Sequence, residues 1–124
     1  FNIKKINITE VSNGVDLSKI KFYDKIKRIS RKKEIGISKS KIAIFIGSWH
    51  QPNIEATEVI FSVAKKLPHY NFIILGSVGE YFKNKNIEIP KNVGFAGIVD
   101  DEEKEMYLSI ADVAINPMIS GSGT

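Results

Sequence analysis

Short, mainly apolar runs recur between residues 42 and 117, with polar segments between them. The first three runs end in glycine, and the last ends in Asn-Pro. Continuous apolar runs of this length are typical of strands that are buried on both faces of a parallel sheet. The pattern therefore predicts four strands, at residues 42–47, 71–76, 92–97 and 112–117.

A helical period follows the first predicted strand. Asn53 is the expected N-cap of this helix, Glu55 lies in its first turn, and Pro68 ends it. The apolar residues that fall on one helix face are Ala56, Val59, Ile60, Val63, Ala64 and Leu67. We expect that face to pack against the sheet.

A second helix is predicted at residues 100–111. Asp100 and Glu103 have the spacing of a capping box, and Met106 and Ile110 are expected to face inward. Residues 77–92 form a polar connection between the second and third strands, with one helical turn near Tyr81. No clear helix start is expected directly after the glycine-rich turn at residues 76–79.

The first forty residues carry a weaker pattern. A short strand is expected at Ile6–Val11, followed by a turn at Asn13-Gly14, because both of these residues tolerate positive φ. One or two helices are expected within residues 17–34, and a polar hinge at residues 38–41.

The order strand, helix, strand, strand, helix, strand predicts the fold class. Most of the strands end in glycine, as they do in open, doubly wound sheets. The expected fold is α/β, with a Rossmann-like open parallel sheet and flanking helices. The chain of 124 residues is long enough for one domain with a modest core.

Composition excludes several classes of function. The chain has no Cys and only two His, so a disulfide framework, a thiol nucleophile and a zinc site are not expected. No apolar stretch approaches the roughly 20 residues that cross a bilayer, and no secretory signal pattern is present. We expect a cytoplasmic location, with the parent protein peripheral to a membrane as an alternative.

Charge is distributed unevenly. Residues 1–41 hold 12 Lys and Arg against 4 Asp and Glu, whereas residues 42–124 hold 6 against 10. A nucleic-acid site in the basic stretch at residues 25–34 is one interpretation. A solvated linker or an exposed helix is the favoured one, because Phe22 and Tyr23 lie beside the basic stretch and are not interleaved with it.

Candidate chemistry lies in the loops that follow the strands, since open α/β sheets bind ligands beyond the carboxyl ends of their strands. The first loop, GSWHQP, lacks the glycine spacing of a dinucleotide site and the GK[ST] of a P-loop. His50 is expected to be packed or solvent-facing rather than a general base, and Asp100-Asp101 is expected to form a helix cap. The last loop, GSGT at residues 121–124, has small residues whose amides can face an anion.

Taken in order, the segments GSWHQPNIEA, NFIILG, PKNVGFAGIVDD and ADVAINPMISGSGT resemble the carboxyl-terminal domain of GT-B fold glycosyltransferases. The nearest type is the retaining group known as glycosyltransferase family four. VSNGVD at residues 11–16 resembles the segment that leads into this domain. Residues 1–40 would then be an interdomain linker, and residues 41–124 the first half of a nucleotide-sugar-binding domain.

The resemblance implies a set of donor-binding residues and no metal cofactor. Gly47 and Ser48 would lie near the donor phosphates, and Gly97 and Ile98 near the base. Asn13 and Gly14 would have a structural role at the domain boundary. The residues matching the loop that approaches the diphosphate and the sugar are Gly121, Ser122, Gly123 and Thr124.

The chain also departs from the family pattern. Trp49 and His50 occupy the region where many relatives carry Lys-Gly. The usual pair of Glu residues, seven positions apart, is expected beyond Thr124. A Lys that often follows the last loop, and the acceptor domain, are not in this sequence either. The sequence therefore predicts a fragment of a glycosyltransferase, without catalytic residues of its own and inactive by itself.

Two alternatives remain open from the sequence: a nucleotide-binding α/β module without transfer chemistry, and a nucleic-acid-binding domain that uses the basic stretch. The expected ligand is a nucleotide-sugar donor, with UDP, GDP or another nucleotide. The acceptor is not specified. Self-association is expected through the fourth strand, because an apolar sheet edge pairs with other chains.

Overall fold

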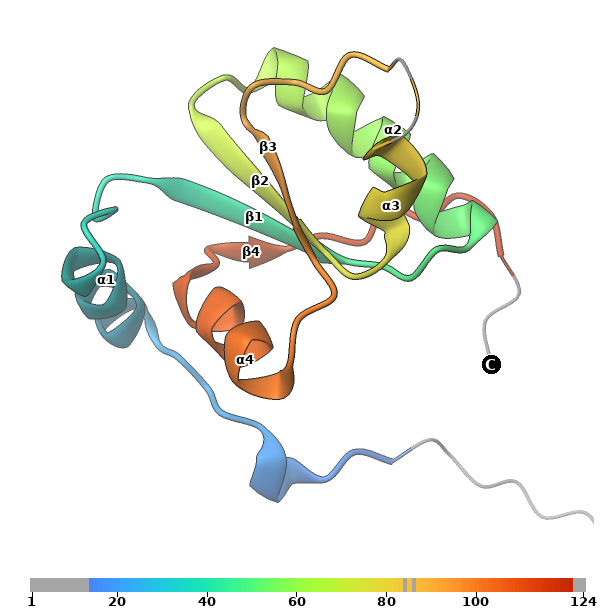
Figure 1. Ribbon diagram of the computed structural model, residues 1–124. Coiled ribbons are helices and arrows are strands. Elements are labelled where there is room, and N and C mark those ends of the chain that lie inside the picture. Colours follow the sequence, from blue (N-terminus) through green and yellow to red (C-terminus); the bar gives the residue numbers. More distant parts are fainter. Residues whose placement is uncertain (1–13, 84, 86, 122–124) are drawn as a thin grey trace, which may run out of the picture.

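The computed structural model describes residues 14–83, 85 and 87–121, and it is an α/β domain built on a parallel sheet (Figure 1). The strand predicted at Ile6–Val11 and the Asn13 half of the predicted turn lie outside the described residues. The elements are, in chain order, η2 (Leu17–Lys19), α1 (Lys25–Glu34), β1 (Lys41–Ile46), α2 (Gln51–Lys66), β2 (Tyr70–Leu75), α3 (Val78–Lys83), β3 (Val93–Gly97), α4 (Asp101–Ile110) and β4 (Val113–Ala114).

The described sheet has four parallel strands in the order β3-β2-β1-β4. β1 pairs with β2 along its whole length, and it pairs with β4 only at Ala43 and Ile44. A register shift interrupts the pairing of β2 with β3 between Ile74 and Leu75. This topology confirms the predicted Rossmann-like fold class, and it brings the ends of β3, β2 and β1 side by side.

The side chains of successive residues in β1 point to opposite faces of the sheet. Ala43 and Phe45 pack with α2 and α3, while Ile44 packs on the other face with Leu75 and Ala111. Figure 1 shows α2 and α3 covering one side of the sheet and α1 and α4 lying on the other. The larger core is on the α2 side, because the apolar face of that helix is buried there.

α2 begins three residues earlier than the sequence pattern predicts. Its N-cap is His50, which makes no side-chain capping bond, and Asn53 already lies in the first turn. Proline at the start of a helix has a suitable φ and lacks only an N–H that would have no partner there, so Pro52 extends the helix toward β1. The predicted N-cap at Asn53 is therefore wrong.

The prediction of the buried face of α2 is confirmed in the middle of the helix and wrong at its carboxyl-terminal end. Ala56, Ile60 and Ala64 are buried, whereas Val63 and Leu67 are exposed. Thr57 and Phe61 are buried in addition, so the buried face is rotated toward them. The reason is that α3 and β3 supply aromatic partners for Phe61 on that side.

α3 is a six-residue helix that begins at Val78, directly after the turn that follows β2. The helical turn predicted near Tyr81 is confirmed, but the expectation that no helix starts after residues 76–79 is wrong. Phe82 of this helix is almost fully buried and stacks on Phe95, with ring centroids 5.8 Å apart. Packing of this aromatic ring stabilises a helix too short to form alone.

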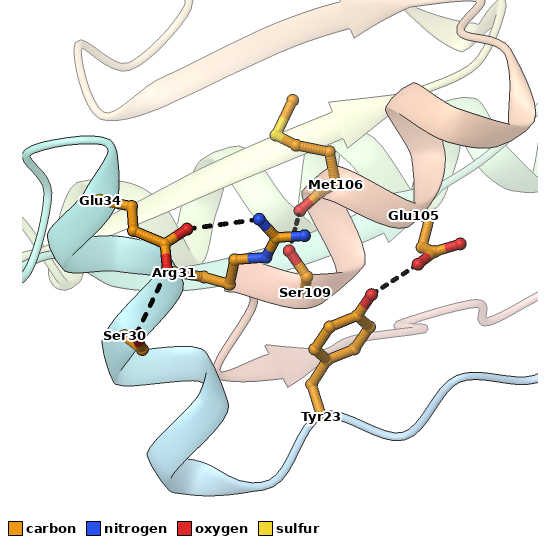
Figure 2. A network of polar contacts seen from close by, with 7 residues as sticks. All are labelled: Tyr23, Ser30, Arg31, Glu34, Glu105, Met106 and Ser109. Carbon is orange, nitrogen blue, oxygen red and sulfur yellow. Dashed lines mark hydrogen bonds and ion pairs between the residues drawn. The ribbon is translucent and has the colours of Figure 1, made fainter.

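α4 begins with the predicted capping box. Asp100 accepts a hydrogen bond from the Glu103 N–H (2.8 Å), and Glu103 accepts one from the Asp100 N–H (3.3 Å). Ile110 is buried as predicted, but Met106 is 44% exposed. Ser109 is the second buried residue of the helix, and its hydroxyl donates to the Met106 carbonyl (2.7 Å) (Figure 2).

The fourth strand is shorter and more exposed than predicted. Only Val113 and Ala114 have strand geometry, and both are exposed. The amides of Asp112 and Ile115 still donate to the Ile42 and Ile44 carbonyls, at 2.8 and 2.9 Å. Pro117 lacks a donor and cannot extend this ladder. The prediction of a buried strand at residues 112–117 is therefore wrong in extent and in burial.

α1 occupies the predicted basic stretch and packs against α4 (Figure 2). Asp24 caps it by accepting from the Lys27 N–H (2.8 Å). Before it, Tyr23 donates its hydroxyl to Glu105 of α4 (2.5 Å). The residues between 17 and 34 thus form one helix and a short 3-10 turn, in agreement with the prediction of one or two helices.

Candidate functional site

Three glycines lie beside one another at the carboxyl-terminal edge of the sheet: Gly47 directly after β1, Gly76 directly after β2, and Gly97 at the end of β3. The Gly47 N–H donates to the Leu75 carbonyl (3.0 Å), and the Gly76 N–H donates to the Gly97 carbonyl (2.6 Å). The Gly47 carbonyl in turn accepts from the Val78 N–H (3.2 Å). The structure therefore brings Gly47 and Gly97 to one edge, with Gly76 between them.

Close packing explains glycine at position 47. A Cβ there would lie 2.9 Å from Cε1 of Phe45 and 3.1 Å from Cβ of Asn53. Gly97 has a positive φ of 77° and open space where a Cβ would point. The backbone at Gly97 is therefore approachable by a ligand, and the following residue, Ile98, has an 80% exposed side chain.

The loop after β1 is fixed by side chains from two other segments. The Trp49 N–H donates to the Ser77 hydroxyl (2.7 Å), and Asn53 Nδ2 donates to the Ser48 carbonyl (2.9 Å). Asn53 Nδ2 also lies 3.3 Å from the Ser48 hydroxyl oxygen. The backbone of Ser48 and Trp49 is held from both sides, although the side chains of both residues are exposed.

The loop after β4 meets the first turn of α2. The Ser120 hydroxyl donates to Glu55, and Gln51 Nε2 donates to the other carboxylate oxygen of Glu55 (3.1 Å). A Cβ on Gly121, whose φ is 121°, would lie 3.3 Å from Cγ of Pro52. The first and the last loop of the sheet edge are thereby brought together.

Hydrogen bonding changes the acidity of the carboxylate at this contact. The bond from Ser120 and then the bond from Gln51 lower the pKa of Glu55 below its ordinary value, while burial opposes this shift. Both bonds favour the charged form. Glu55 is therefore an anion at neutral pH, and it repels a second anion on its own side of the edge.

An aromatic pair lies beside the loop after β1. Trp49 is 59% exposed, and its ring meets the ring of Tyr81 edge-on, with centroids 6.3 Å apart. On the Tyr81 ring lies Lys85 Nζ, 3.8 Å from the centroid. Trp49 is the single tryptophan of the chain, so its fluorescence reports on this edge.

The predicted donor-binding residues can now be placed. Gly97 is the last residue of β3, and Gly47, Ser48, Ile98 and Gly121 lie in loops at the same carboxyl-terminal edge. Ser122, Gly123 and Thr124 lie outside the described residues. The contacts that sequence reasoning missed are those of Ser77 and Glu55. Ser77 is the second residue after β2, and Glu55 lies one helical turn after Gln51, but neither spacing indicates a partner across the loop.

The other candidates have simpler roles. His50 is exposed at the start of α2, in agreement with the solvent-facing interpretation. Asp100 caps α4, as expected. In the described part of the chain, no group of three or more His, Cys, Asp and Glu side chains could hold a metal ion. No helix within those residues is long and apolar enough to cross a membrane.

Comparison with known proteins adds no assignment. No protein-family model matches the sequence, and no curated protein matches it.

Proposed function

We propose that the carboxyl-terminal edge of the sheet binds a nucleotide-sugar donor, as part of a retaining, metal-independent glycosyltransferase of the GT-B fold. The observation that carries the proposal is the contact of the last loop with the first turn of α2, through Ser120 with Glu55 and Gly121 with Pro52. Ligands of open α/β sheets bind at this edge. The resemblance of the ordered sequence segments to the donor-binding domain of these enzymes supports the same conclusion.

The diphosphate is assigned to the Ser48 side of the edge. The Ser48 side chain is exposed, and its hydroxyl remains able to donate to a phosphate oxygen. The Glu55 carboxylate, an anion in the first turn of α2, disfavours a phosphate next to Ser120. The nucleoside is assigned to Gly97 and Ile98, where the space next to Gly97 is open.

Trp49 fluorescence tests nucleotide binding directly. We expect a saturable change on titration with UDP, GDP or ADP in the presence of EDTA, because Trp49 is exposed and adjoins Ser48. Ser48→Glu should weaken binding about 10-fold, since it adds a negative charge beside the diphosphate. Ser62→Glu, which adds the same charge on the exposed surface of α2, should change it less than about twofold.

Two outcomes would contradict the proposal. One is the absence of any fluorescence change with all three nucleotides at millimolar concentration. The other is an equal loss of affinity in the Ser48→Glu and Ser62→Glu variants, which would mean that the added charge acts at long range. Equal affinity for a nucleoside diphosphate and its sugar adduct would favour a nucleotide-binding module without transfer chemistry.

The chain of 124 residues is expected to release no nucleoside diphosphate from UDP- or GDP-sugars without metal. Sugar transfer requires neutralisation of the leaving diphosphate and stabilisation of the positive charge that develops on the sugar. The described residues assigned to the donor, which are Gly47, Ser48, Gly97, Ile98 and Gly121, carry no charge that could neutralise the diphosphate. A coupled assay of released UDP or GDP measures this activity. Turnover above a buffer blank would contradict the expectation, because it would show that the residues of this chain suffice for catalysis.

A further inference from the structure

A second hollow lies at the opposite end of the sheet, where β1 begins. It is a cavity of about 340 Å³ between one face of α1, the segment at residues 38–41 and Asp112, which precedes β4. Because parallel strands all start at the same edge, this cavity and the candidate donor site are at opposite edges of the sheet. The proposed function does not use it.

Cationic side chains dominate the lining of this cavity. Lys25, Arg28 and Lys32 face it from α1, at the i, i+3 and i+7 positions of one helix face. Lys39, which precedes β1, and Lys41, its first residue, also line the cavity. Asp112 supplies the single carboxylate among the residues that line it.

The Asp112 carboxylate already has partners within the protein. Lys32 is only 4% exposed, and its Nζ lies 2.5 Å from Oδ2 of Asp112 and 2.8 Å from the Ser40 carbonyl. The Ile42 N–H also donates to Oδ2 of Asp112 (2.8 Å). Lys32 and Asp112 therefore largely neutralise each other, and the remaining cations leave an excess of positive charge in the cavity.

The other cationic side chains that line the cavity have hydrogen-bond donors that a ligand could use. Within the described part of the chain, Lys25 and Lys39 form no ion pair, and both are exposed. Arg28 donates from Nη2 to the Tyr23 carbonyl (3.0 Å), but its Nε is buried and lacks a partner among those residues. A buried donor without an acceptor is costly, and a bound anion is one way to satisfy it.

We propose that this cavity binds a small phosphate-bearing anion, in which Lys25 and Lys39 contact the phosphate and Arg28 reorients toward it. Its volume is at the lower end of the range for small-molecule sites, which begins at about 300 Å³. A diphosphate or a phosphate monoester with a small organic group is of suitable size. A concave basic site of this kind suits a compact anion better than the extended backbone of a nucleic acid.

Calorimetric titration with inorganic pyrophosphate, at low salt and without metal, tests the proposal. In the Ser48→Glu background, which weakens diphosphate binding at the donor edge, we expect saturable binding of one pyrophosphate in this cavity. Adding Lys25→Gln or Lys39→Gln should weaken this affinity about 10-fold, since each loses one charge-assisted contact. Lys33→Gln is the matched control, because Lys33 is an exposed cation of the same helix that does not line the cavity. Its effect should stay below about twofold.

Ser48→Glu separates this site from the donor site. It should leave pyrophosphate affinity at the cavity unchanged, whatever it does to nucleotide binding at the other edge. Equal losses in Lys33→Gln and Lys39→Gln would overturn the proposal, because attraction would then come from the surface as a whole. No heat of binding at millimolar pyrophosphate would also overturn it.

Two further arms identify the source of the phosphate. If the ligand is a lipid headgroup, phosphatidylcholine vesicles that contain phosphatidic acid should bind the chain, and this binding should be lost in Lys39→Gln but not in Lys33→Gln. If the ligand is soluble, glycerol phosphate should bind instead, and its binding should likewise be lost in Lys39→Gln but not in Lys33→Gln. An oligonucleotide that binds more tightly than pyrophosphate, and is equally sensitive to Lys33→Gln and Lys39→Gln, would replace the proposal with a nucleic-acid surface.

Discussion

At the scale of single residues, Gly76 shows how the ends of three strands are joined. Its φ is 95°, and a Cβ there would lie 2.3 Å from the Gly47 carbonyl oxygen. The same residue donates its N–H to Gly97. Glycine is thus required twice at position 76, by backbone conformation and by the approach of the neighbouring strand.

Gly76→Ala should lower the free energy of unfolding by about 3 kcal/mol. Part of this loss comes from an alanine in the left-handed conformation, and the rest comes from the overlap of its Cβ with Gly47. Gly36 also has a positive φ, of 77°, but open space for a Cβ. Gly36→Ala should therefore cost only about 1 kcal/mol. Urea unfolding of both variants measures the difference, and equal losses would contradict the contact with Gly47.

Gly94 supplies the control without either constraint. It lies in β3 with open space around a Cβ and an ordinary φ. Gly94→Ala should leave stability unchanged or raise it by about 0.5 kcal/mol, because alanine loses less backbone entropy on folding.

At the scale of elements, the pair Lys32–Asp112 connects α1 to the start of β4. Burial raises the pKa of Asp112, but hydrogen bonds from Lys32 and from the Ile42 N–H, together with the charges of Lys32 and Arg28, outweigh it. The net result is a lowered pKa. The charged form of Asp112 is therefore favoured by folding.

Asp112→Ala should lower the free energy of unfolding by about 2 kcal/mol, because it leaves buried Lys32 without its counter-charge. The expected loss is smaller than for a fully buried ion pair, because Asp112 is partly exposed. Asp112→Asn should cost less, since its amide oxygen can still accept from Ile42. Urea unfolding at pH 7 measures both. A loss as small as that of a surface substitution would contradict the role of the pair.

The lowered pKa of Asp112 also predicts a pH dependence. A carboxylate whose folded-state pKa lies below its unfolded value stabilises the fold above about pH 4, and this stability is lost as the pH falls through the folded-state pKa. The stability difference between the wild type and Asp112→Asn should therefore be constant above about pH 5 and shrink below pH 4. A difference independent of pH would contradict this assignment.

A second connection joins the segment before α1 to α4. Lys21 and Tyr23 both donate to Glu105, at 2.8 and 2.5 Å (Figure 2 shows the Tyr23 bond). The bond from Lys21, followed by that from Tyr23, lowers the pKa of Glu105, and the same bonds raise the pKa values of Lys21 and Tyr23. These bonds orient the segment rather than stabilise the core, because Lys21 is exposed, Tyr23 and Glu105 are only half-buried, and water screens their interactions.

At the scale of the whole molecule, the two faces of the sheet are covered unequally. α2 and α3 cover the larger core, but an apolar groove of about 250 Å³ remains between α2 and β4. Val63, Leu67, Ile115 and Pro117 are among the residues that line it. Val113, on the adjacent edge strand, is 48% exposed. An apolar edge beside an apolar groove favours association with another chain.

We therefore predict that the chain self-associates through β4. Light scattering should give a mass above that of a monomer, which is 13.9 kDa. Val113→Lys should shift the population to monomer, because a charged residue on an edge strand opposes pairing. Ile26→Lys, at an exposed apolar residue of α1, is the control and should leave the mass unchanged. A monomeric wild type at high concentration would contradict the prediction.

The sequence by itself determined the first three strands, the helices α2 and α4 and the parallel sheet, because these depend on local hydrophobic period and on capping residues such as Asp100. It also located the loops of the candidate site, since strand ends carry glycine. Only the tertiary structure decided which side chains meet: Ser120 with Glu55, Trp49 with Ser77, and Lys32 with Asp112. These pairs are 65, 28 and 80 residues apart, and no periodic pattern encodes a partner at such separation. The short β4 and the rotated face of α2 were likewise decided by packing against neighbours that the local pattern does not contain.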